Sequence, residues 1–194
     1  MENFEKIVQS YQQKINTFTI VEISDIPNID LYIDQVTTFI DNVLQPYKRS
    51  DESKILTKTM INNYTKAKVF PPPIKKKYGK MHIMLLIMLF HLKSVLSIKD
   101  IAILFEPIFL ASSNSKSETE KQIEQLYQGF IGLQKSTIIN MQLSIDASHT
   151  IHQENTLHNY SDDMKKIMFV LLLSIRANME KQLAEHILDL TFTK

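Results

Sequence analysis

The sequence predicts an all-α protein with at most a short β hairpin. Apolar residues recur at helical spacing in most segments of the chain. The 194 residues include only three glycines and six prolines, which is too few for the turns of a β-rich protein. Hydrophobic residues make up 44% of the chain, enough to form a substantial core.

Two amphipathic helices are predicted in the N-terminal part. The first covers residues 3–18, where apolar side chains follow a period of 3.6 residues. Pro27 interrupts the chain, and a second helix follows at about residues 29–44, before Pro46.

The middle of the chain predicts a short polar helix followed by an extended basic segment. Thr57 is a suitable N-cap for a helix that continues to about Lys66. No helix can pass through Pro71–Pro73, so residues 74–78 should be extended, and Gly79 should turn the chain.

A buried helix should follow. Residues 81–95 are apolar on nearly every side, which is typical of a central helix. Ser97 should cap a short helix over residues 98–105, and Pro107 with residues 111–117 should form a linker. We therefore predict a helical domain at residues 1–110 and a C-terminal helical domain at 111–194.

The C-terminal domain should be a bundle of two or three helices, at about residues 118–133, 136–148 and 161–190. The last helix carries an apolar stripe, which indicates either a dimerisation or effector region or a face that covers its own core. The stripe consists of Met164, Ile167, Met168, Leu171, Ile175, Met179, Leu183 and Ile187.

Composition argues against several classes of function. The chain has no cysteine, which excludes disulfides and thiolate chemistry, and its glycines do not cluster as a phosphate-binding loop requires. No signature of a hydrolase, metalloprotease or kinase is present. We expect no enzyme activity, cofactor or metal site. With no signal-peptide pattern and no apolar run of membrane-spanning length, we expect a cytoplasmic protein without a membrane partner.

Positive charge is concentrated in residues 54–80, here called the lysine segment. It holds eight of the 22 basic residues and none of the 21 acidic ones, so the rest of the chain carries 14 basic against 21 acidic side chains, a net of −7. Such a segment in a nearly neutral protein is typical of a site for a polyanion, although lysine runs also serve as solvated faces.

The residue types in this segment suit duplex DNA. Asparagine can bridge the adenine edge in the major groove, threonine and lysine contact phosphates or bases, and an acidic residue would be repelled. Adjacent lysines on a short extended element can hold backbone phosphate. The candidate DNA-binding residues are Thr57, Lys58, Asn62, Asn63, Tyr64, Lys66, Lys75, Lys76, Lys77, Tyr78 and Lys80.

The order of these elements resembles the winged helix-turn-helix of MerR-type regulators. Matching positions are Ile61, Tyr64, Lys66, Val69, Phe70 and Pro72 in the helix and turn, Lys76, Lys77 and Tyr78 in the wing, and Ile98–Ile101 in the last segment. Asn62 stands where that family has arginine, and Lys68 where it has glycine. The resemblance covers about 50 residues and implies a wing and a recognition helix at about residues 30–105.

A second resemblance covers about residues 25–105. The run from Asp30 to Val36, together with Leu56 to Lys66, is similar to a family of bacterial proteins known as a domain of unknown function. This resemblance bears on the fold and implies no activity.

The sequence therefore predicts a DNA-binding transcriptional regulator, acting as a homodimer on duplex DNA. The alternative is a helical protein-interaction module that keeps the helix-turn-helix scaffold without binding DNA. The sequence does not identify a small-molecule effector.

Overall fold

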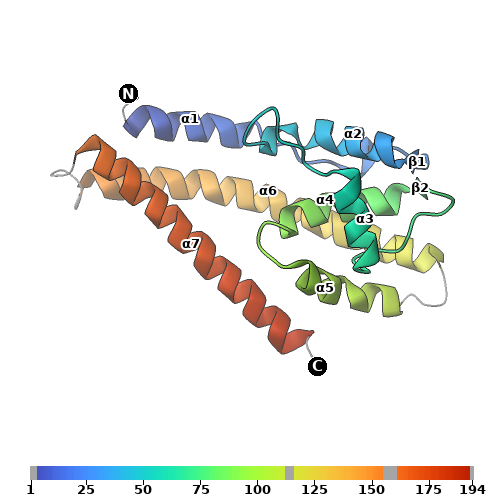
Figure 1. Ribbon diagram of the computed structural model, residues 1–194. Helices are drawn as coiled ribbons and strands as arrows, with labels where there is room; N and C mark the ends of the chain where they lie inside the picture. Colours follow the sequence, from blue (N-terminus) through green and yellow to red (C-terminus); the bar gives the residue numbers. More distant parts are fainter. Residues whose placement is uncertain (1–3, 112–115, 155–160, 193–194) are drawn as a thin grey trace. The chain divides into compact units, whose positions relative to one another are not determined.

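The described part of the chain is mostly helical, as predicted. The computed structural model describes the backbone of residues 4–111, 116–154 and 161–192, and the side chains of 6–110, 116–143 and 161–192. This part of the chain forms seven α-helices, two short 3-10 helices and one pair of short strands (Figure 1). In chain order these are α1 (Phe4–Asn16), η1 (Ile23–Asp25), β1 (Leu31–Tyr32), α2 (Ile33–Val43), η2 (Gln45–Tyr47), α3 (Lys58–Lys66), β2 (Lys77–Tyr78), α4 (Lys80–Leu92), α5 (Ile98–Ala111), α6 (Lys116–Glu154) and α7 (Asp162–Thr191).

The chain forms two compact units, each built from separate stretches. One consists of residues 1–18 and 133–184, and the other of residues 19–132 and 185–194. Four residues of the predicted linker, 112–115, lie outside the described residues. The predicted division of the chain after residue 110 remains a prediction.

The larger unit, 19–132 with 185–194, is organised around α4. Every side chain from Met81 to Leu89 is buried, which confirms the prediction of a central helix. α2 contacts α3, α4 and both strands. The first half of α6 contributes Ile123, Tyr127 and Ile131 to the same core, and the Tyr127 hydroxyl donates to the Val21 carbonyl at 2.9 Å.

The two strands form a small antiparallel sheet. Leu31 pairs with Tyr78, and Tyr32 pairs with Lys77. The prediction of a helix from residue 29 is therefore wrong at its start, because residues 31 and 32 are extended to pair with β2 and α2 begins at Ile33. The periodicity of the apolar residues could not show this pairing between distant segments.

Two helices are longer than predicted. Pro107 lies inside α5, which continues to Ala111, so the prediction of a helix end near Phe105 is wrong. The predicted helices at 118–133 and 136–148 are parts of one helix, α6. Gln134 and Lys135, which separate the two predicted helices, are both good helix formers, so nothing in the sequence at this join ends the helix.

The smaller unit, 1–18 with 133–184, joins α1 to the later part of α6 and most of α7. Its core is a small cluster around Val8 and Ile15, against which Phe18, Ile138 and Phe169 pack. Gln142 donates a hydrogen bond from its amide to Asn16. In the described part of the chain, no helix combines the length and apolar character that crossing a membrane requires.

Candidate nucleic-acid interface

The short helix α3 presents a polar face because its apolar face is buried. Thr57 caps the helix, accepting a hydrogen bond from the Met60 amide at 3.2 Å, as predicted. Ile61 and Tyr64 are buried in the core. Lys58, Asn62 and Lys66, spaced four residues apart, are exposed on one face of the helix.

A residue in the left-handed conformation follows α3, two positions after the helix ends at Lys66. Lys68 has φ 58°, and the amide of Val69 donates to the Tyr64 carbonyl at 3.0 Å. Such an end is usually built with glycine, because a side chain is disfavoured at positive φ. The lysine is held there although it lacks the conformational freedom of glycine.

Residues 74–78, here called the lysine hairpin, make a tight two-residue turn. The amide and carbonyl of Ile74 exchange hydrogen bonds with those of Lys77, at 3.1 and 2.9 Å. Lys75 and Lys76 between them have φ 50° and 64°. Positive φ at both central residues is typical of a type I′ turn, which favours Asn-Gly. Lys68, Lys75 and Lys76 are the described non-glycine residues with positive φ.

The hairpin is anchored at its base. The Lys77 ammonium lies 5.2 Å from the centre of the Tyr32 ring, across the β1–β2 pair. His82 is buried at the start of α4, where its Nδ1 accepts from the Gly79 amide and its Nε2 bonds the Pro71 carbonyl, both at 3.2 Å. Burial lowers the pKa of His82 and so favours the neutral ring. A neutral ring with one donor and one acceptor nitrogen satisfies both bonds.

α3 and the lysine hairpin meet at a surface pocket of about 270 Å³. Lys58 and Asn62 line it from α3, and Lys76 and Tyr78 line it from the hairpin, with Ile33 and Pro73 completing the wall. Four predicted site residues from two separate segments therefore share one surface.

Little negative charge offsets these lysines. Among the described ion pairs, only one involves a residue of the lysine segment, namely Lys58 with Asp34 of α2. Both side chains are more than half exposed, so solvent screens the pair and its attraction is weak. The surface can therefore accept an anion.

The other predicted site residues differ in exposure. Asn63, Lys66 and Lys75 are exposed, whereas Thr57 is half-buried beneath its capping bond. Tyr64 and Tyr78 are only 5% and 3% exposed, so these rings belong to the core beneath the surface. Burial also raises the pKa of both tyrosines.

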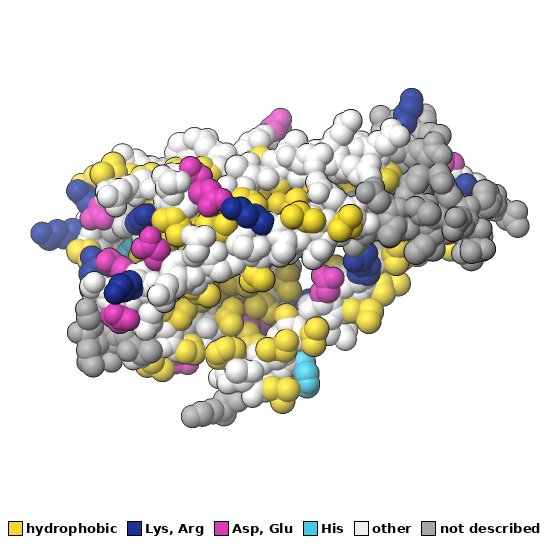
Figure 2. All heavy atoms as spheres, turned by 180° about the vertical axis from the view of Figure 1, so that it is seen from behind, with side chains coloured by type: hydrophobic (Ala, Val, Ile, Leu, Met, Phe, Trp, Pro, Cys, Tyr) yellow, Lys and Arg dark blue, Asp and Glu magenta, His cyan; other side chains and the backbone are white. Residues whose placement is uncertain are grey.

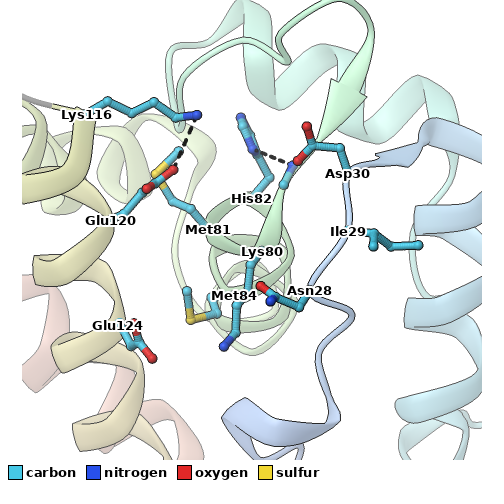
Figure 3. A pocket seen from close by; sticks show the side chains of 11 residues that line it. Asn28, Ile29, Asp30, Lys80, Met81, His82, Met84, Lys116, Glu120 and Glu124 are labelled. Carbon is cyan, nitrogen blue, oxygen red and sulfur yellow. Dashed lines mark hydrogen bonds and ion pairs between the residues drawn. The ribbon is translucent and has the colours of Figure 1, made fainter.

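Lys80 lies apart from the other predicted residues, in a second pocket of about 460 Å³ (Figure 3). Asp30, Glu120 and Glu124 also line this pocket, and Glu120 pairs with Lys116 at 3.5 Å. A Cβ on Gly79 would lie 2.9 Å from the Asp30 carboxylate, so the chain passes closely here. With three acids among its lining residues, this pocket suits a polyanion less well than the first.

The sequence did not indicate two residues of the interface. Tyr32, which is 54% exposed beneath Lys77, lies in β1, and Asp34 lies in the first turn of α2. An exposed aromatic ring in a short segment is a weak signal, and only the pairing of β1 with β2 brings it to the hairpin. Among the described residues, no group of three or more His, Cys, Asp or Glu side chains is arranged to hold a metal ion.

The fold and site define a helical protein with a basic hairpin beside a short polar helix. In a comparison with known families, the family described as "Domain of unknown function (DUF1836)" matches residues 21–130. The chain therefore belongs to this family. The match contains the whole interface. No curated protein and no solved structure matches the chain.

Proposed function

We propose that this protein is a DNA-binding transcriptional regulator that holds duplex DNA between α3 and the lysine hairpin. The single observation that carries the proposal is the shared pocket, in which Lys58 and Asn62 of α3 lie with Lys76 of the hairpin. Lysines on two elements can contact phosphates on both sides of a groove, while an asparagine between them faces the bases.

The strained backbone of the lysines supports the same proposal. A left-handed conformation costs a residue with a side chain about 1–2 kcal/mol. In the described chain that cost falls on Lys68, Lys75 and Lys76, all within the lysine segment. Glycine or asparagine would adopt this conformation at a lower cost. The presence of lysine at these positions is explained if binding requires its positive charge.

The proposal extends to a winged helix-turn-helix of the MerR type, in which η2 and a loop join the two helices. In this proposal α2 and α3 are the paired helices, α3 is the recognition helix, and the lysine hairpin is the wing. Lys68, at the place of the MerR-type glycine, has the positive φ that suits a glycine. With side chains, an α-helix is about 10–12 Å wide and fits a major groove of about 12 Å.

Salt-dependent binding tests the proposal. We would measure the Kd of the full chain for a fluorescent random-sequence duplex over a series of KCl concentrations. Replacing Lys75, Lys76 and Lys77 with alanine should weaken binding to every sequence alike and reduce the salt slope by about three. Alanine keeps the Cβ, so the turn remains as strained as in the wild type.

A matched control comes from three exposed lysines outside the lysine segment. Replacing Lys14, Lys99 and Lys121 with alanine removes the same net charge and should change the Kd and slope far less. If both triple variants changed the Kd and the salt slope equally, binding would depend on the net charge of the protein and not on the lysine hairpin. No binding by the wild type at low salt would reject the proposal.

The exposed apolar side chains of α7 favour a second candidate, a protein-interaction module. Ile175 and Met179, for example, are 58% and 66% exposed, and such surfaces often bind proteins. The two candidates differ in the role of the lysine segment, because only the first predicts steeply salt-dependent binding of DNA.

A further inference from the structure

The described side chains of the smaller unit bury very little apolar surface. Among its described side chains, only Val8 and Ile15 are buried hydrophobics. Many of its large hydrophobic side chains are exposed on α6 and α7, including Leu143, Ile167 and Leu171. So small a core offsets little of the entropy lost in ordering three helices, and further burial would stabilise the unit.

The exposed apolar residues of α7 form one continuous stripe. Figure 2 shows hydrophobic side chains at the surface along this helix. The stripe consists of Met164, Ile167, Leu171, Ile175, Met179, Leu183, Ile187 and Leu190, which are 43–73% exposed. Met168, which we predicted in this stripe, is half-buried instead.

The stripe is symmetric about its own midpoint. Reading inward from the two ends, Met164 corresponds to Leu190, Ile167 to Ile187, Leu171 to Leu183, and Ile175 to Met179. The two numbers add to 354 in every pair, so the centre lies at the level of residue 177. A surface with this symmetry presents the same spacing of apolar side chains when it is reversed end to end.

We propose that a second copy of this chain covers the stripe, with the two α7 helices packed antiparallel about a twofold axis between Ile175 and Met179. A twofold interface places residue i against j and j against i, and the symmetry of the stripe provides such pairs of apolar residues. The inference rests on the proposed function in one respect. The regulator is expected to act as a homodimer, and the stripe would be the interface of that dimer.

The spacing of the stripe also indicates how the helices cross. Its first and last residues are 26 positions apart and are joined by seven steps of about 3.7 residues, so the stripe turns slowly around a helix of 3.6 residues per turn. Four-residue rows of two helices pack together when the helices cross at about −50°. The contact is then centred on the inner four residues, Leu171, Ile175, Met179 and Leu183.

The available area fits a dimer of modest affinity. An extended chain exposes about 165 Å² for a residue of leucine's mass. Eight residues at a mean exposure slightly above one half therefore offer roughly 750 Å² on each copy, near the ~800 Å² per partner of a standard interface. Because crossed helices bury only part of this area, we expect dissociation at micromolar concentrations.

The first test is the mass of the full chain in solution without DNA. Sedimentation equilibrium over roughly 1–100 µM should show a monomer–dimer equilibrium, as interfaces at the small end of the range do. Met179→Lys should shift it to monomer, whereas Leu110→Lys, at a position equally 66% exposed on α5, should not. Both sites are exposed in the monomer, so circular dichroism should show unchanged helix content.

The second test is the direction of packing. The chain has no cysteine, so introduced thiols form only the intended crosslinks. Under oxidation, a mixture of Leu171→Cys and Leu183→Cys chains should form mixed disulfide dimers, and either variant alone should form few. A parallel pair would give the opposite pattern, because each residue would then face its own copy.

Three results would overturn the inference: a monomeric wild type at the highest concentration, a dimer that Met179→Lys leaves intact, or the parallel crosslinking pattern. A monomer would mean that the chain itself or another protein covers the stripe. Because these measurements contain no DNA, a dimer that fails to bind DNA would reject the proposed function alone.

Discussion

Lys75 and Lys76 combine positive charge with an unfavourable backbone conformation at the tip of the hairpin. If the charge explains their presence, Lys75→Asn with Lys76→Gly should separate the two properties. Asn-Gly fits the turn and should raise the free energy of unfolding by about 1–2 kcal/mol, while the lost cations should weaken DNA binding.

Urea denaturation and duplex titration of the same preparation measure both effects. The matched variant with alanine at both positions keeps the strain and should weaken DNA binding without a gain in stability. If Asn-Gly stabilised the protein and left the affinity unchanged, the lysines would have no role in binding.

Asn62 is the residue that we expect to read sequence. It is exposed on α3 and lines the pocket shared with Lys58 and Lys76. An asparagine can make a paired contact with adenine, and its loss costs about 1–3 kcal/mol at one base pair. Binding-site selection with Asn62→Ala should therefore relax preference at a single position. If the wild type and the variant selected the same DNA sequences, Asn62 would have no role in reading the base sequence.

At the scale of the elements, α3 and the hairpin were predictable because local chemistry determines them. Thr57 caps α3, Ile61 and Tyr64 define its buried face, and Pro71–Pro73 prevents a helix before the hairpin. The short helix was therefore predicted correctly. The prediction of an extended segment over residues 74–78 is wrong at Lys75 and Lys76, which form a left-handed turn before β2. The meeting of α3 and the hairpin at one pocket depends on tertiary packing, which the sequence pattern does not contain.

The features that the sequence analysis missed also depend on contacts between distant segments of the chain. β1 forms because Leu31 and Tyr32 pair with residues more than 40 positions later in the chain. Tyr64 and Tyr78, which were also proposed as site residues, both have buried rings, and the sequence pattern did not indicate the burial of Tyr78. Asp34 could not be connected with Lys58 before the place of α2 was known.

Pro107 provides a prediction for α5. It lies inside the helix, where it removes one backbone donor and its ring crowds the preceding turn. The residue is exposed, so Pro107→Ala should remove this strain without opening the core and raise the free energy of unfolding by about 1–3 kcal/mol. Glu106→Ala at the exposed neighbouring position is the control. No gain over that control in chemical denaturation would contradict this account of α5.

For the whole molecule, we expect a pH dependence of stability from the half-buried His91. Aromatic rings of Tyr47, Phe90 and Phe130 surround His91, with centroids 5.1–5.4 Å away, and burial lowers the pKa of His91 to about 4. The unfolded chain binds this proton with a pKa of about 6.5. Stability is therefore fully present above pH 6.5 and falls as the pH decreases toward 4.

The expected loss from His91 over this range is about 2–3 kcal/mol. His82, whose pKa burial also lowers, adds a loss in the same direction. His91→Phe cannot bind the proton and should flatten the decrease measured by urea denaturation between pH 7 and 4. A variant with the wild-type pH profile would show that His91 does not control it.

The central claim is that duplex DNA covers the face formed by α3 and the lysine hairpin, and lysine footprinting tests it most directly. Acetylation of the full chain, with and without a duplex at low salt, would be quantified at each lysine by mass spectrometry. We predict protection at Lys58, Lys66, Lys75 and Lys76 and unchanged labelling at exposed Lys14, Lys99 and Lys121. The account would be contradicted if saturating duplex left the labelling of Lys58, Lys66, Lys75 and Lys76 unchanged. It would also be contradicted if the duplex protected only Lys14, Lys99 and Lys121.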